Sequence, residues 1–190
     1  MGRVICLVMG YVFGLFQTGY LYGKMNHIDI RNYGSGNSGT TNALRVMGKK
    51  AGLIVFAGDF LKTVFACLAA RIIFKGSPDT DLYVLYAGLG VVLGHNFPCY
   101  LNFKGGKGIA SVAGILVSMD WRVTLVCAAL FLGAVIITRY VSLGSILVVI
   151  SFLSRYWSTG AWNIYRLCGS SHGVLCRCLR PDGDGEFWRH

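Results

Sequence analysis

Charged residues are scarce in this sequence, and acidic residues are the scarcest. Of its 190 residues 14% are charged, and Asp and Glu together number only 8. Soluble domains contain about 25% charged residues, so this chain lacks the groups that keep a surface in water. Hydrophobic residues make up 54% of it. This balance argues against an ordinary soluble domain and favours a protein embedded in a membrane.

The sequence also lacks the cysteine spacings of zinc sites and of a disulfide framework. Three cysteines lie in apolar stretches, where cysteine behaves as a small hydrophobe: Cys6, Cys67 and Cys127. Cys176 and Cys178 are separated by one residue, and together with Cys168 they match no common zinc pattern. The cysteines therefore indicate neither a metal site nor a secreted, disulfide-bonded domain.

Long apolar stretches account for most of the chain. A membrane-spanning helix needs about 20 mostly apolar residues. Six stretches approach or reach this length: 4–22, 51–74, 82–97, 109–119, 122–138 and 141–156. The stretch 109–119 is too short to span a membrane alone unless it is tilted or packed inside a bundle. We therefore expect an all-α, polytopic bundle of membrane helices.

The basic residues lie in loops between these stretches. The net charge of +10 is concentrated in segments 23–50 and 97–108, whereas the turn 75–81 carries two aspartates. This pattern fits membrane topology and anionic head groups, so we expect no nucleic-acid partner. By the positive-inside rule, both basic segments are cytoplasmic and the N-terminus is outside.

Residues 34–45 form a polar, glycine-rich segment with the composition of an anion site. Glycines let backbone N–H groups converge on an anion because no Cβ blocks the approach. Six side chains add donors: Ser35, Asn37, Thr40, Thr41, Asn42 and Arg45. The glycine spacing formally matches a dinucleotide fingerprint, but that motif needs a preceding strand. We predict anion binding here in preference to a plain turn.

Residues 94–108 repeat this composition with two lysines, Lys104 and Lys107. The segment is not a nucleotide P-loop, because the glycine spacing and the Ser/Thr after the lysine are missing. A basic anchor at the membrane surface is the alternative, although the adjoining His95 and Asn96 favour a binding site. For His95 itself a structural role and a catalytic role both stay open.

Three further polar residues are candidates for supporting roles. Asp59 and Lys62 lie one helical turn apart in an apolar stretch, where charges are costly and are usually paired or functional. A packing pair within one helix is the alternative. Ser142 follows Arg139 at a helix start, where it would either cap the helix or support the site.

Three stretches of the sequence resemble the bacterial membrane acyl-phosphate:glycerol-3-phosphate acyltransferases. They are residues 23–45 with Gly-Ser-Gly-Asn at 34–37, residues 94–108 with Gly-His-Asn-Phe-Pro and Phe-Lys-Gly-Gly-Lys-Gly, and Ser-Leu-Gly-Ser at 142–145. The likeness runs from about residue 15 to residue 150. Thr40 stands where the family usually has alanine.

The resemblance implies a seven-helix protein of the bacterial inner membrane that needs no metal and no cofactor. It implies transfer of a fatty acyl group from acyl phosphate to glycerol 3-phosphate, which gives lysophosphatidic acid and phosphate. The implied catalytic residues are Ser35, Asn37, Arg45 and His95. The implied phosphate-binding residues are Gly34, Gly36, Thr41, Asn42, Lys104, Gly105, Gly106, Lys107 and Gly108. Asp59, Lys62 and Ser142 are the supporting residues.

The likeness weakens towards the C-terminus. The family's third motif contains Asn-Ile followed by Arg-Leu, and this chain carries an echo of it at residues 163–167, where Tyr165 intervenes. The composition changes after Tyr156, so we expect a membrane domain at 1–156 and an aberrant tail at 157–190 that reflects a shifted frame, a truncation or genuine divergence. A transporter or channel for phosphorylated metabolites, or an inactive relative, is the alternative function.

Overall fold

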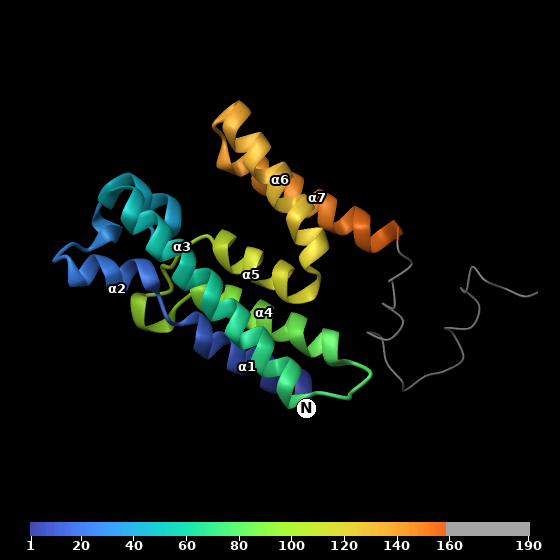
Figure 1. The fold of residues 1–190 in the computed structure, drawn as a ribbon. Coiled ribbons are helices and arrows are strands. Elements are labelled where there is room, and N and C mark those ends of the chain that lie inside the picture. Colours follow the sequence, from blue (N-terminus) through green and yellow to red (C-terminus); the bar gives the residue numbers. More distant parts are fainter. Residues whose placement is uncertain (159–190) are drawn as a thin grey trace, which may run out of the picture.

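The structure, a computed structural model, describes residues 1–158, and all regular structure in this range is helical (Figure 1). The α-helices are α1 (Gly2–Gly14), α2 (Thr18–Met25), α3 (Thr40–Ile73), α4 (Thr80–Asn96), α5 (Ile109–Met119), α6 (Trp121–Thr138) and α7 (Val141–Ser158). Two short 3-10 helices, η1 (Ile30–Asn32) and η2 (Cys99–Leu101), lie in the connections. The expected all-α architecture is confirmed. The predicted tail at 157–190, with the motif echo at 163–167, lies beyond residue 158 almost entirely and so outside the described residues.

The first apolar stretch is not one helix as predicted, because residues 15–17 separate α1 from α2. Side chains from three parts of the chain bind the carbonyl groups that this break frees. Gln17 and Lys62 donate to the Gly14 carbonyl, Lys62 also to that of Phe16, and Tyr100 to that of Leu15. A break at membrane depth is tolerated where the protein itself satisfies the backbone in this way.

The segment 34–45 is not a loop throughout, as the sequence suggested, because α3 already begins at Thr40. This long helix is interrupted at Gly48, whose φ of 87° lies in the left-handed region that glycine adopts without strain. The other predicted apolar stretches match α4 to α7 within two residues at either end. Uniform hydropathy locates these helices well.

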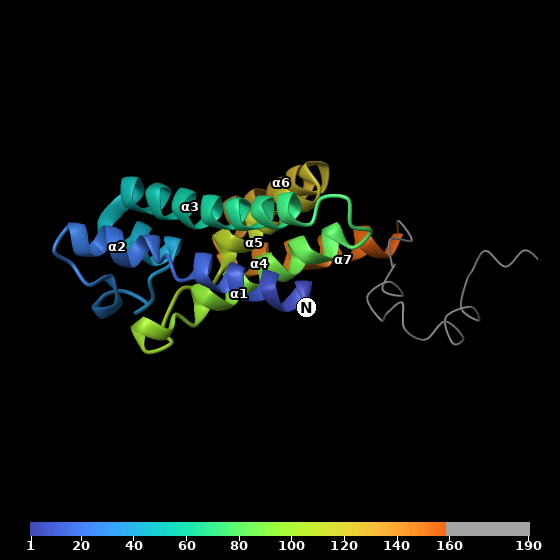
Figure 2. The same cartoon turned by 90° about the horizontal axis from the view of Figure 1, so that it is seen from below.

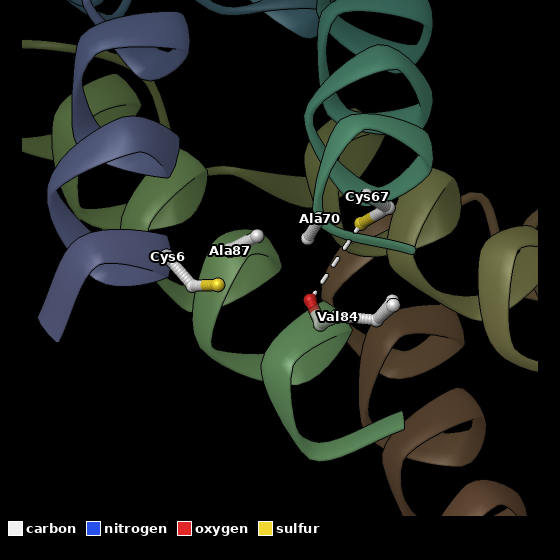
Figure 3. Packing of buried hydrophobic residues seen from close by; sticks show 5 residues of the cluster. All are labelled: Cys6, Cys67, Ala70, Val84 and Ala87. Carbon is white, nitrogen blue, oxygen red and sulfur yellow. Dashed lines mark hydrogen bonds between the residues drawn. The ribbon is translucent and has the colours of Figure 1, made fainter. Parts of the chain in front are cut away.

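Helices α1 and α4 pack with their backbones close together (Figure 2). A Cβ at Gly10 would overlap the carbonyl group of Ala87, and one at Gly90 would overlap that of Leu7. Small residues allow this close approach. In lipid there is no hydrophobic driving force between helices, so close packing of this kind holds them together. The core where α1, α3 and α4 meet accordingly consists of small side chains: Cys6, Cys67, Ala70, Val84 and Ala87 (Figure 3).

Helices α6 and α7 form a hairpin that packs on itself and leans away from α1 and α2 (Figure 1). Its surface is strongly apolar, and Ile136 and Ile137 are 76% and 83% exposed. Four stretches of the described chain are long and apolar enough to cross a membrane: Gly2–Met25, Thr40–Ile73, Thr80–Leu101 and Trp121–Thr138. The exposed apolar side chains fit contact with lipid.

Candidate active site

The two glycine-rich segments meet at one cavity of about 280 Å³. It lies where the segment before α3, the start of α5 and the turn between α6 and α7 converge. Its lining residues are Ser35, Asn37, Gly39, Thr40, Thr41, Arg45, Asp59, His95, Lys107, Gly108, Ile109, Ala110, Arg139 and Tyr140. Segments more than 50 residues apart in the sequence thus share one site.

Two helix N-termini open into this cavity. Helix α3 begins after Gly39 and α5 after Gly108, and neither of these N-cap residues has a side chain to accept from the first N–H groups. The first turns of both helices line the cavity. Free N–H groups and the helix dipole together make such an N-terminus an anion site. The cavity therefore has two places suited to a phosphate group.

The charged side chains around the cavity are mainly cationic. Arg45, Lys107 and Arg139 line it, and the carboxylate of Asp59 lies at its buried end. That carboxylate is already paired with Lys62, whose Nζ lies 2.8 Å from Asp59 Oδ1. The unpaired charge that faces the cavity is therefore positive, as dianionic ligands require.

Asn42 holds the first segment in shape and does not line the cavity. Its fully buried side chain accepts from the N–H of Ser35 at 2.9 Å. Its amide nitrogen donates to three carbonyl groups, those of Ile30, Tyr33 and Asn37. Both N–H groups of this amide are used here, one of them shared between two carbonyl oxygens. In this structure Asn42 thus holds the segment in shape, and the phosphate contact predicted for it stays a prediction.

Ser35 and Asn37 stand at the cavity with their side chains already oriented. The Asn37 amide donates to Ser35 Oγ at 3.0 Å and accepts from the N–H of Gly39 at 3.1 Å. Gly34 and Gly36 do not line the cavity, and their φ values of 62° and 72° supply the tight turn. These two glycines thus shape the segment, and the phosphate contact predicted for them stays a prediction.

The start of the segment is clamped by Asp29 and Arg31. The Arg31 guanidinium donates to both carboxylate oxygens of Asp29, at 3.0 and 2.8 Å. These hydrogen bonds hold the pKa of Asp29 below its ordinary value. The same guanidinium lies 4.8 Å from the ring centroid of Tyr20 on α2, which anchors the segment to that helix.

The second segment is built against the C-terminal end of α4. The N–H of Gly105 donates to the carbonyl of Asn96 and that of Gly106 to the carbonyl of His95, both at 3.1 Å. A Cβ at Gly106 would overlap the His95 ring, so glycine is needed for close approach. These amides are committed to α4 and are not free for a phosphate. Lys104 stands outside the lining, whereas Lys107 and Gly108 belong to it.

Lys62 connects the wall of the cavity to the break between α1 and α2. Its buried Nζ lies 2.8 Å from Asp59 Oδ1, 3.0 Å from His95 Nδ1 and 2.6 Å from the carbonyl oxygen of Phe16. Because the carboxylate and the carbonyl oxygen can only accept, we assign a charged ammonium to Lys62. An ammonium can only donate, so His95 Nδ1 presents a lone pair to it. The proton of a neutral His95 then resides on Nε2, on the side of the ring that faces Gly106.

Comparison with known proteins shows the family of this chain. Residues 4–170 match the family described as glycerol-3-phosphate acyltransferase. The chain belongs to this family. It is 38% identical over 179 residues to the glycerol-3-phosphate acyltransferase of Thermoanaerobacter sp. (strain X514), covering 92% of this chain and 88% of the relative. It is 45% identical over 148 residues to that of Clostridioides difficile (strain 630), covering 75% and 71%.

Two solved structures of the family share the fold. Both are crystal structures of PlsY (YgiH), an integral membrane glycerol 3-phosphate acyltransferase. The glycerol 3-phosphate form has a TM-score of 0.75 and 36% identity, and the lysophosphatidic acid form has 0.73 and 35%. Each likeness covers 84% of this chain and 78% of the other. An integral membrane acyltransferase fold is therefore established for the chain.

The sequence analysis did not predict two residues that the structure places at or beside the cavity. Gln17 is fully buried, donates to the carbonyl of His95 at 2.9 Å and accepts from Ser38 Oγ at 2.9 Å. It thereby joins both glycine-rich segments, and its one visible signal was a polar residue in an apolar stretch. Arg139 lines the cavity, and its signal was a basic residue in the short connection between the apolar stretches 122–138 and 141–156. Ser142 belongs to the first turn of α7, just after this turn.

Proposed function

We propose that this membrane glycerol-3-phosphate acyltransferase takes its acyl group from acyl phosphate and releases lysophosphatidic acid and phosphate. The observation that carries this proposal is the pair of uncapped helix N-termini at one cationic cavity. Both substrates carry phosphate, and each N-terminus suits one phosphate group. The names of the relatives and the two forms of the solved neighbour support the acceptor and the product.

Two groups of residues bind the two phosphates in this proposal. The N-terminus of α3 holds one phosphate together with Ser35, Asn37, Thr41 and Arg45, all of which line the cavity. The N-terminus of α5 holds the other together with Lys107 and Gly108. Other predicted residues act indirectly, by shaping the two segments. Asn42, Gly34 and Gly36 shape the first segment, and Gly105 and Gly106 fasten the second segment to α4.

The reaction needs no covalent intermediate on the protein. The first hydroxyl oxygen of glycerol 3-phosphate attacks the acyl carbonyl carbon, an ester bond forms, and the bond from that carbon to the phosphate oxygen breaks. The hydroxyl proton passes to a phosphate oxygen of the substrates, because the described residues hold no placed Ser–His–Asp set. Positioning of an activated donor and stabilisation of developing charge supply the rate.

His95 serves as a donor in this scheme and not as the general base. Its Nδ1 accepts from the Lys62 ammonium, so Nε2–H, beside Gly106, is the donor left on this cavity-lining residue. Ser35 orients a substrate phosphate through a hydroxyl that Asn37 already holds. Asp59 and Lys62 keep the His95 ring in place from behind.

We also propose that both glycine-rich segments face the cytoplasm of a bacterial cell, with the N-terminus outside. The excess of Lys and Arg in these segments supports this orientation. So does their position at one end of the α1–α5 bundle, opposite the turn between α3 and α4, where Asp79 precedes α4 and Asp81 lies in its first turn (Figures 1 and 2). We keep residues 1–156 as the acyltransferase domain.

Purified protein in detergent tests the donor directly. Radiolabelled glycerol 3-phosphate is mixed with palmitoyl phosphate or with palmitoyl-coenzyme A, and lysophosphatidic acid is measured. We expect product with the acyl phosphate alone, and at least a tenfold loss in Arg45→Ala and in Lys107→Ala, since charged hydrogen bonds to phosphate are the strong ones. Lys49→Ala, which changes an exposed lysine outside the cavity, is the matched control. Product with the coenzyme A ester alone would refute the donor assignment.

A further inference from the structure

The turn between α6 and α7 places an arginine at the cavity from a separate part of the fold. Arg139 and Tyr140 line the cavity, although the hairpin to which they belong packs on the rest of the protein chiefly through α5. The backbone of this turn is well defined. The N–H of Arg139 donates to the carbonyl of Val135 at 2.8 Å, and the N–H of Tyr140 donates to Thr138 Oγ1 at 3.2 Å.

Arg139 has a backbone conformation that residues with long side chains seldom adopt. Its φ of 60° and ψ of 12° lie in the left-handed region, where glycine or asparagine usually ends a helix. Attraction to the C-terminal end of the α6 dipole is the simplest reason for a cation here. That attraction does not account for the position of Arg139 at the cavity, beside two other cations, Arg45 and Lys107.

The charges around Arg139 favour an anion between these cations. Among residues 1–158, Arg139 has no carboxylate within ion-pair distance. Asp59, the acidic residue of the lining, is taken by Lys62. Three cations around one cavity repel one another unless a ligand of opposite charge lies between them. A phosphate ester or acyl phosphate carries up to two negative charges near neutral pH, and a guanidinium binds such a group through two parallel hydrogen bonds.

We infer that Arg139, which belongs to the α6–α7 hairpin, is a third phosphate-binding cation of this site beside Arg45 and Lys107. The inference rests on the proposed function and adds to it a residue from outside both glycine-rich segments. It also gives the hairpin a function, because a substrate phosphate held by Arg139 ties the hairpin to the helices that carry the other cations. The phosphate belongs either to glycerol 3-phosphate or to the acyl donor, and kinetics with each substrate varied in turn decides between them.

The test uses Arg139→Gln and Arg139→Lys in the full chain, with Arg122→Gln as the matched control. Arg122 lies at the opposite end of α6, where its guanidinium is 5.7 Å from the Trp121 ring. We expect Arg139→Gln to raise the KM for one phosphate substrate by about 10- to 100-fold, the range for a lost charged hydrogen bond. Arg139→Lys keeps the charge and should raise that KM less, and Arg122→Gln should stay within about twofold of the unchanged protein.

Thermal unfolding in detergent separates binding from a merely structural role. We expect the melting temperature of Arg139→Gln without ligand to match that of Arg122→Gln, and its stabilisation by glycerol 3-phosphate or inorganic phosphate to be reduced. Should Arg139→Gln not fold, Arg139→Lys is judged by the same two readouts. Unchanged KM values for both substrates, compared with Arg122→Gln, would overturn the inference. Activity of the unchanged protein tests the proposed function separately.

Discussion

The helices α1–α5 and the α6–α7 hairpin are held together in different ways. In the α1–α5 bundle, glycines bring backbones together, and buried Gln17, Asp59, Lys62 and His95 connect the ends of three helices. In the hairpin, a Phe131 ring packs over Gly144, and Gly133 has open space around it. Large apolar side chains cover much of the hairpin surface.

This contrast shows where a membrane enzyme obtains a defined site. Apolar surface alone does not drive helices together in lipid, whereas close backbone packing and buried hydrogen bonds do. Of the residues proposed to bind or orient substrate, His95 lies on α4, and Ser35, Asn37 and Lys107 lie in segments that connect helices of this bundle. The hairpin contributes its turn, and the rest of its surface is free to contact lipid.

Removal of the buried ammonium of Lys62 should have the largest effect on the bundle. Lys62→Met leaves the buried Asp59 carboxylate without its cationic partner, with the Thr18 hydroxyl still donating to it, and frees the carbonyl of Phe16. Breaking one side of a buried pair costs about 3–5 kcal/mol, so we expect a large fall in melting temperature and loss of activity. Lys75→Met, at an exposed position in the turn after α3, is the control. Equal melting temperatures for the two variants would show that the bundle does not depend on this network.

Gly10→Ala, which adds a single methyl group between α1 and α4, should have the next largest effect on stability. In Gly10→Ala the new Cβ overlaps the Ala87 carbonyl, which is backbone and cannot turn aside. Overpacking of this kind costs about 1–3 kcal/mol, measured as a fall in melting temperature in detergent. Gly10 is remote from the cavity lining, so any loss of activity should follow the loss of folded protein. A variant as stable as the unchanged protein would contradict the close packing of α1 on α4.

Loss of the Asn42 amide should affect substrate binding more than stability. Asn42→Ala removes the four hydrogen bonds that shape the first glycine-rich segment. Buried groups left unsatisfied cost about 1–3 kcal/mol, which we expect to appear as a KM for glycerol 3-phosphate raised by about tenfold or more. Asn32→Ala, at an exposed position in η1, should change little. If both variants bind substrate equally well, Asn42 does not organise the site.

The same glycine-to-alanine change in the hairpin should have the smallest effect. Apart from the adjacent residues and the backbone of α6, no atom of the described chain lies within 4 Å of the place that a methyl group on Gly133 would take, so Gly133→Ala meets no obstacle there. Alanine is the better helix former by about 0.5–1 kcal/mol, and we expect an equal or slightly higher melting temperature. This variant is also the control for Gly10→Ala. A loss as large as that of Gly10→Ala would mean that the hairpin is packed as tightly as the bundle.

Much of the fold was predictable because hydropathy is a local property. The apolar stretches alone predicted the bounds of α4 to α7 to within two residues. The break at residues 15–17 was not, since Lys62 and Tyr100, which satisfy its carbonyl groups, lie far along the chain. The site was predictable by composition, yet an amide such as that of Asn42 suits backbone carbonyls as well as phosphate. Which of the two it meets depends on contacts that spacing does not reveal.

By itself the sequence determined that this chain is a membrane helix bundle with two cationic, glycine-rich segments, because hydropathy, charge and glycine content act over a few residues. Only the tertiary structure decided that both segments share a cavity with Arg139, that Gln17 joins them, and that Lys104, Gly105 and Gly106 stand back from it. The physical reason is that these facts depend on how distant helices approach one another, and that approach is set by backbone contact between glycines and by buried hydrogen bonds.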